Sequence, residues 1–317
     1  MPMRKMIFAA VAAAFAVPAA FAGVPRNLPL PSGTPGADEI IKQVYYVNHF
    51  YGLKNFGIVE DGGEITVIVN KEKGSEPKTL TVERYLNNDY PEGGEVKAQD
   101  LAIFRSGKLN GTGMLITDYT DDAKSQSYAI WIPAIRKIRR FAQPDANDAW
   151  GGTDFTFEDV VLRKPEHEKH ELQGTATFDV CLGAVAIAAG DQSKYTQNLP
   201  KEGSCAPKGK KVFKVKSTPN RDNWPYDYRV SYVDAETFAD YRIEYFKAGK
   251  QFKVIDKDWR PLPGAGDKRM QAWSYWYGKN LDSEHETWAV IPSKVIRTNQ
   301  TYDADWWSEN TLQKIKQ

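Results

Sequence analysis

The chain has 317 residues, of which 26% are charged and 12% are aromatic, and its formal net charge is +1. This balance excludes general nucleic-acid binding, which needs a strongly basic surface. After the N-terminus no segment reaches 18 consecutive apolar residues, so we expect no stable membrane anchor.

The N-terminus predicts a cleaved signal peptide over residues 1–22. Arg4 and Lys5 form a basic start, an apolar stretch too short to span a bilayer follows, and an Ala-Phe-Ala sequence precedes the cut. Cleavage before Gly23, rather than before a cysteine, leaves no lipoprotein acylation site. Loss of the two basic residues lowers the formal net charge to −1. We therefore expect an exported, soluble protein.

Residues 23–36 are rich in Pro and Gly, which predicts an extended lead-in. From Asp38 to Tyr51 the apolar residues recur at helical spacing, which predicts an amphipathic helix. Further along the chain the period changes to two, as in antiparallel strands with one apolar and one solvent-exposed face. The clearest such strands are 228–232, 241–245 and 251–254.

The stretch from Ser127 to Asp159 is the most informative. It begins as an aromatic strand that stops at Pro133, a residue that cannot donate a ladder hydrogen bond. A basic run and then an acidic, Gly-containing segment follow, without a nucleophile motif or phosphate loop, which indicates recognition rather than catalysis. The basic run contains Arg136, Lys137, Arg139 and Arg140, and the acidic segment contains Asp154, Glu158 and Asp159.

This block, W-x-P-A-x-R-x-x-R-R and then G-T-D-F-x-x-E-D, resembles the outer-membrane lipoprotein-sorting proteins of the LolA-like superfamily. The resemblance covers residues 37–312. It implies a periplasmic protein with a strongly curved antiparallel sheet, an incomplete barrel with helices across its opening and lipid or acyl chains in its hollow. We expect one such mainly β (α+β) domain over residues 37–317. The chain departs from the family pattern at Trp150-Gly151-Gly152, where a smaller aromatic residue and a methionine are expected before the glycine.

The basic run allows three interpretations. It is a solvated face, a docking site for an anionic partner, or a latch that closes a covering loop over the hollow. The latch predicts that Arg139 or Arg140 reaches Asp154, Glu158 or Asp159. It also places Trp131 or Trp150 beside the hollow.

The aromatic cluster of residues 273–277 predicts a strand that is apolar on both faces. Simple alternation puts Trp273 and Tyr277 on one face and Trp276 on the other. A sheet that is apolar on both faces needs covering helices or a ligand inside its curve. We therefore count Trp273 and Tyr275 among the candidate cargo-binding residues.

Two cysteines remain in the exported chain, Cys181 and Cys205. In an oxidising compartment they predict a disulfide, with Cα atoms within ~7 Å of each other. The bridge would close an apparent insertion around residues 180–208 that has no counterpart in the family pattern.

His167 and His170 have a spacing that would place both rings on one face of a helix, as in a metal site. No second ligand cluster accompanies them, so we interpret them as part of a solvated polar loop. We expect no metal and no cofactor.

These observations favour a periplasmic carrier that binds lipid or lipoprotein acyl chains in an open β-barrel hollow and transfers them between envelope partners, including a membrane-embedded exporter. The alternative is a non-transporting accessory or sensor subunit of such an exporter. An envelope lipid or glycan hydrolase is a weaker third option because no G-x-S-x-G elbow is present, and we expect no enzyme.

Overall fold

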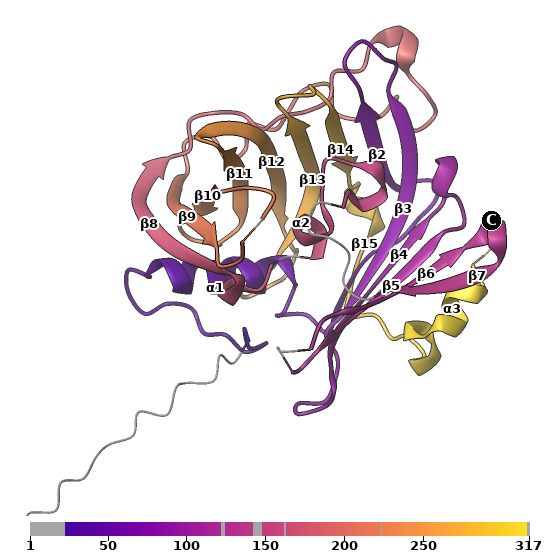
Figure 1. Cartoon of the computed structure of the whole chain (residues 1–317), viewed down its shortest axis with the longest axis horizontal. Coiled ribbons are helices and arrows are strands. Elements are labelled where there is room, and N and C mark those ends of the chain that lie inside the picture. The colour runs from indigo at the N-terminus through magenta and orange to yellow at the C-terminus, as the bar shows by residue number, and fades with distance from the viewer. Residues whose placement is uncertain (1–22, 122–123, 142–147, 162, 223, 316–317) are drawn as a thin grey trace, which may run out of the picture.

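The computed structural model describes residues 23–121, 124–141, 148–161, 163–222 and 224–315; the predicted signal peptide lies outside these ranges. Within them, fifteen strands form one antiparallel sheet that curls strongly without closing into a barrel (Figure 1). This confirms the predicted mainly β, curved antiparallel fold. The strands are β1 (Asn55–Ile58), β2 (Thr66–Lys71), β3 (Lys78–Asn87), β4 (Val96–Phe104), β5 (Gly113–Tyr119), β6 (Ser127–Ile132), β7 (Lys137–Phe141), β8 (Glu168–Thr177), β9 (Lys211–Pro219), β10 (Tyr228–Asp234), β11 (Asp240–Lys247), β12 (Lys250–Pro261), β13 (Gln271–Asn280), β14 (Glu286–Val290) and β15 (Ile296–Thr298).

The sheet consists of two meanders, β2–β7 and β8–β14, which meet where β2 pairs with β14. The short strand β1 pairs with β3 and β15. Strands β7 and β8 are neighbours in sequence but form opposite edges of the sheet. The chain that links them must therefore pass from one edge to the other. Its described part lies inside the curl, on what we call the concave side (Figure 1).

Three α-helices are present among the described residues: α1 (Ala37–Asn48), α2 (Phe157–Val161) and α3 (Glu309–Gln313). Helix α1 confirms the predicted N-terminal helix, and it lies across the opening of the curled strands β8–β12 (Figure 1). It buries Ile40, Ile41 and Val47, while Asp38 and Glu39 in its first turn suit the positive end of the helix dipole. In the described part of the chain no helix is long and apolar enough to cross a membrane.

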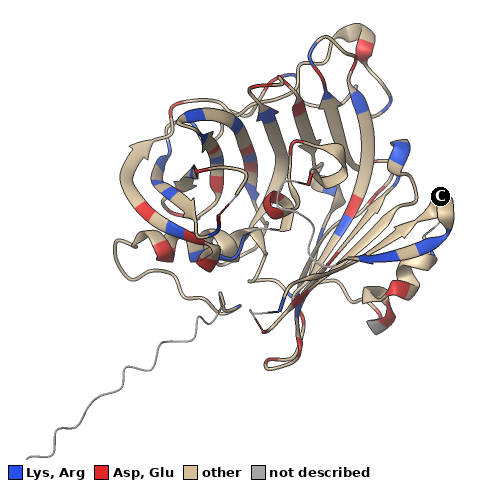
Figure 2. Cartoon of the chain, in the orientation of Figure 1, with Lys and Arg blue, Asp and Glu red and all other residues tan. Residues whose placement is uncertain are grey.

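The concave face of the curl is partly charged, which the alternation pattern did not predict. On β10 the buried positions include Arg229 and Ser231, and on β12 they include Lys253 and Lys257. The expected solvent-exposed face at Arg229, Ser231 and Lys253 is therefore wrong. Residues of both signs follow the curled strands in Figure 2.

A β-bulge changes which tryptophans share a face. Trp259 pairs with Trp273 whereas Asp258 pairs with Tyr275, so Ser274 is an extra residue in β13. As a result the rings of Trp273 and Trp276 meet at 5.2 Å. The predicted placement of these two rings on opposite faces is wrong.

The disulfide between Cys181 and Cys205 is present, with Cα atoms 4.3 Å apart, as predicted. The bridge closes a loop of residues 181–205, the disulfide loop, which packs on the outer face of the sheet. The backbone N–H of Gly183 donates to Asp256 Oδ2 at 2.7 Å, and that of Ser204 donates to Tyr275 Oη at 2.8 Å. Tyr275 is therefore covered by this loop, on the face opposite to the hollow.

Candidate functional site: the covered concave side

A short segment crosses the concave side and fills it. We call residues 149–161 together with Arg163 the cover segment. It includes the single turn of residues 150–152 and helix α2. Its aromatic side chains contact three different strands: Trp150 packs on Phe104 of β4, Phe155 on Trp276 of β13 and Phe157 on Tyr128 of β6, with ring centroids 5.3, 5.6 and 5.8 Å apart.

The turn of the cover segment depends on Gly151, because its φ of 62° lies in the left-handed region. A Cβ at this position would also lie 3.3 Å from the ring of Phe104. Glycine therefore allows the segment to turn and to press Trp150 onto the sheet.

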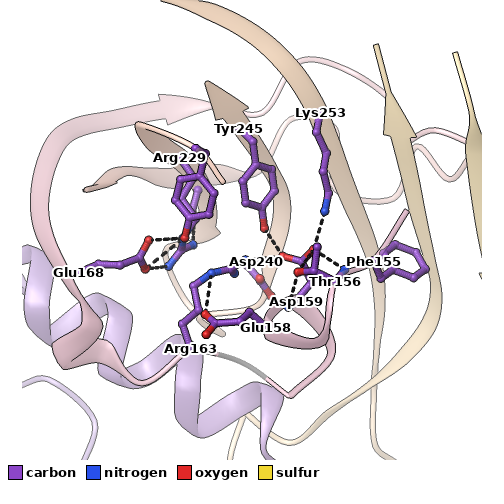
Figure 3. A network of polar contacts seen from close by, with 12 residues as sticks. Phe155, Thr156, Glu158, Asp159, Arg163, Glu168, Arg229, Asp240, Tyr245 and Lys253 are labelled. Carbon is purple, nitrogen blue, oxygen red and sulfur yellow. Dashed lines mark hydrogen bonds and ion pairs between the residues drawn. The ribbon is translucent and has the colours of Figure 1, made fainter. Parts of the chain in front are cut away.

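The cover segment is attached to the sheet through a buried carboxylate, Asp159, which is 3% exposed (Figure 3). Its oxygens accept from Tyr245 Oη at 2.6 Å, from Lys253 Nζ at 2.5 Å and from Arg163 Nη2 at 2.7 Å. Burial by itself raises the pKa of Asp159, but Lys253 and Arg163 outweigh it and hold that pKa well below its ordinary value. Asp159 is therefore ionised, and its negative charge compensates the buried positive charges of Lys253 and Arg163.

Two further buried pairs continue the charge network. Glu168 of β8 pairs with Arg229 of β10 at 2.6 Å, and although burial opposes it, this arginine lowers the pKa of Glu168 to about 2. Lys257 pairs with Asp240 at 2.8 Å and also donates to Asn48 of α1 at 2.8 Å. Burial outweighs Asp240 and lowers the pKa of Lys257. The network thus joins α1, the cover segment and the curled strands.

Other contacts attach the cover segment at its two ends. Asp154 accepts from His285 Nδ1 at 2.7 Å and from Thr287 Oγ1 at 2.9 Å. Burial raises the pKa of Asp154, and the bonds to His285 and Thr287 oppose that rise. At the other end, Arg84 Nη2 donates to the carbonyl oxygen of Val160 at 2.9 Å. The segment is therefore held by strands of both meanders.

The predicted latch has other partners in the structure. Arg140 pairs with Glu309 of α3 at 2.5 Å on the outer face, so the predicted pairing with the acidic segment is wrong. Arg136 and Arg139 are exposed, and neither has an ion-pair partner among the described residues. Asp159 of the predicted acidic segment does lie at the concave side, but the cations that pair with it are Arg163 and Lys253.

The predicted aromatic residues are distributed over both faces. Trp150 borders the concave side and is buried there. Trp131 instead lies in the cluster beneath α3, with Leu115 and Leu312, because alternation along β6 turns it away from Tyr128. Trp131 therefore does not border the hollow, and its predicted place there is wrong.

His170 is occupied by bonds within the protein. Its Nδ1 lies 2.9 Å from Ser217 Oγ and its Nε2 lies 2.9 Å from the carbonyl oxygen of Pro165. Strand β8 begins at Glu168, so His170 stands in the sheet and not in the predicted polar loop. In the part of the chain that the structure describes, no group of three or more His, Cys, Asp or Glu side chains could hold a metal ion.

Two cavities of very different volume remain on the concave side. A cavity of about 540 Å³ opens beside the cover segment, between Asp154 and Arg163 on one side and Tyr226, Tyr245 and Phe252 on the other. A cavity deeper inside, between α1 and Trp276, encloses only about 30 Å³, room for little more than one water molecule. The cover segment and the charge network thus occupy the inside of the curl.

Sequence reasoning missed the residues that hold the cover segment, namely Arg84, Tyr245, Lys253 and His285. One signal was available: Lys253 and Lys257 are in phase with the apolar Ile255 along one strand. A lysine in phase with buried apolar residues needs a buried anion.

The open curled sheet and the helix across its concave side define a LolA-like fold, as the sequence resemblance predicted. Among solved structures, an outer membrane lipoprotein-sorting protein domain from Vibrio parahaemolyticus matches with a TM-score of 0.65 at 14% identity, covering 88% of this chain and 98% of that one. A DUF1329 family protein from Desulfovibrio piger matches with a TM-score of 0.65 at 14% identity, covering 88% and 100%. A LolA superfamily protein from Nitrosomonas europaea matches with a TM-score of 0.53 at 9% identity, covering 87% and 99%.

A family model described only as an uncharacterized protein matches residues 97–185, the part of the chain that contains the cover segment. No curated protein matches the sequence.

Proposed function

We propose that this protein is a periplasmic carrier that binds a hydrophobic cargo, lipid or lipoprotein acyl chains, on the concave side of its sheet. The observation that supports this best is the aromatic contact between the cover segment and the sheet. Phe104, Tyr128 and Trp276 offer apolar surface on three separate strands, and the protein's own Trp150, Phe157 and Phe155 now cover it. Acyl chains would take the place of these three side chains.

The sheet covered by its own segment and the sheet covered by an acyl chain have comparable free energies. Burial of three aromatic side chains contributes roughly 5–9 kcal/mol, at about 1.5–3 kcal/mol each. An acyl chain that buries about ten methylenes gains roughly 8 kcal/mol at about 0.8 kcal/mol per CH₂. Because these terms nearly cancel, the polar attachments through Asp154 and Asp159 decide whether the segment covers the sheet.

The cavity beside the cover segment suits the first contact with cargo. Its volume of about 540 Å³ falls within the range of ligand pockets. Tyr226 and Phe252 offer apolar surface, while the exposed Lys247 offers positive charge to an anionic head group. Cargo would bind here before it displaces the segment.

A carrier also needs a donor and an acceptor, and a membrane-embedded exporter fits the first role. The edge strand β7 offers a docking surface for it. Arg139 carries a charge without an ion-pair partner among the described residues, and the neighbouring Ile135 and Phe141 are exposed hydrophobic side chains. Figure 2 shows the basic residues on this strand at the far edge of the sheet.

The second candidate is a non-transporting accessory or sensor subunit of an exporter. The observation that favours it is the charged interior, since Lys253, Lys257 and Arg229 line a space that a lipid carrier would keep apolar. In this function the cover segment stays in place, and only the outer surfaces bind partners.

Mass spectrometry of lipids that copurify with the protein from its native envelope separates the two functions. The matched control is the same protein delipidated by unfolding and refolding, then mixed with envelope lipid. Stoichiometric lipid in the native sample, regained by the refolded one, supports the carrier. Protein that is lipid-free in both samples and takes up no acyl probe supports the accessory function.

A further inference from the structure

A second large cavity, of about 620 Å³, lies on the outer face of the sheet, away from the cover segment. Its floor consists of β12, β13 and the end of β14, and the disulfide loop forms its other wall. Its apolar lining includes Ile65, Val67, Leu199, Val290 and Ile291. The volume fits a small organic ligand.

Arg260 of β12 brings a positive charge to this cavity, which Glu64, Glu202 and Asp258 also line. Its Nη2 donates to two uncharged groups, the backbone carbonyl oxygens of Ile291 and, at 3.4 Å, of Trp273. Its Nε is buried and has no hydrogen-bond partner, and no carboxylate of the described residues lies within ion-pair distance. Burial lowers the pKa of Arg260, with Asp258 opposing the shift, so the guanidinium is incompletely compensated.

Asp258 brings a negative charge to the same cavity. It stands two residues before Arg260 on the same strand, so both side chains share one face, with Cα atoms roughly 6.6–6.8 Å apart. The hydroxyls of Ser204 and Ser274 bond to its carboxylate, yet it too lacks an ion-pair partner among the described residues. Burial raises the pKa of Asp258. A cationic donor would stabilise the ionised form of this half-buried carboxylate against the effect of burial.

From these contacts we propose that the outer cavity binds a small zwitterion with an apolar side chain, that is, an apolar amino acid or a short peptide. The ligand's carboxylate accepts from Arg260, its ammonium group donates to Asp258, and its side chain lies against Leu199 and Val290. A simple anion would be repelled by Asp258, and a simple cation by Arg260, whereas a zwitterion satisfies both groups. The site is separate from the acyl cargo because the sheet lies between them.

Isothermal titration calorimetry on the full exported protein tests this with four probes: L-leucine, dileucine, N-acetyl-leucine and leucinamide. We expect one saturable site for L-leucine or dileucine, and the better of the two tells an amino-acid site from a peptide site. Either cap removes one charge-assisted bond and should weaken binding about tenfold or more relative to the free amino acid.

Three variants accompany the probes. Asp258→Asn and Arg260→Gln should each weaken binding of the better ligand about tenfold or more, while Lys211→Gln, an exposed cation on the distant strand β9, should not. If Arg260→Gln fails to fold, Asp258→Asn and the capped probes on the wild-type protein decide. No binding of L-leucine and dileucine at millimolar concentration overturns the proposal, and so does equal affinity for free and capped leucine.

Discussion

Replacing Asp159 with Asn tests whether the buried charge network holds the cover segment. The substitution keeps the size of the side chain and removes its negative charge. Lys253 and Arg163 then remain buried, at 2.5 and 2.7 Å from a neutral group. Removing one partner of a buried ion pair costs about 3–5 kcal/mol, because the other charge is left uncompensated.

We therefore expect Asp159→Asn to lower the free energy of unfolding by about 3–5 kcal/mol at neutral pH, measured by urea unfolding with tryptophan fluorescence. The matched control is Asp282→Asn, whose partner Lys250 lies 2.6 Å away in a pair with side chains 56% and 72% exposed. Loss of such an exposed pair changes stability by about 1 kcal/mol or less. If the Asp159 variant is as stable as this control, the network does not hold the segment.

Three further predictions concern single side chains. Arg229 holds the folded-state pKa of Glu168 at about 2, below its ordinary 4.5, so the wild-type protein should lose stability as the pH falls through that window. Glu168→Gln should lack this loss in urea titrations across that pH range, and an unchanged pH dependence would contradict the assignment. Phe155→Ala removes the contact with Trp276 and should raise the affinity for a fluorescent acyl probe; lower or equal affinity in a folded variant would count against displacement of the segment. Arg140→Gln breaks a pair whose arginine side chain is 71% exposed and should change the unfolding free energy by about 1 kcal/mol or less, whereas a larger loss would give this arginine a structural role.

Hydrophobic spacing along the sequence was sufficient to predict helix α1 and the antiparallel strands. The helical spacing of Ile40, Val44 and Val47 predicted α1, and the two cysteines predicted their bridge. The period of two predicted antiparallel strands, whereas the curvature of the sheet was expected only from the family resemblance. The hydrophobic spacing that predicts a helix or a strand lies within that element, and the disulfide follows from the oxidising compartment.

The candidate site depends on contacts that no local pattern contains. Asp159 meets Lys253 across 94 residues and Asp154 meets His285 across 131. One bulge at Ser274 was enough to place Trp273 on an unpredicted face, because a strand reverses its faces with every added residue. The sequence therefore predicted the acidic residues that attach the cover segment, Asp154 and Asp159, and missed their partners Lys253 and His285.

The most direct test of the carrier function is to lock the cover segment in place with a disulfide and measure acyl binding. A Cβ at Gly278 would lie 3.1 Å from Cβ of Asp154 and 2.9 Å from the ring of Phe155. An Asp154→Cys, Gly278→Cys pair therefore reaches the 3.5 Å or more typical of bridges when the backbone and the Phe155 ring each shift by a few tenths of an ångström. The wild-type protein with and without reductant controls for the native Cys181–Cys205 bridge.

We predict that the oxidised pair, with its cross-link verified by mass spectrometry, binds no fluorescent acyl probe. Reduction should restore binding to at least the wild-type level, because the reduced variant also lacks the Asp154 bonds to His285 and Thr287. Equal binding by the cross-linked and reduced forms would contradict displacement of the cover segment by cargo.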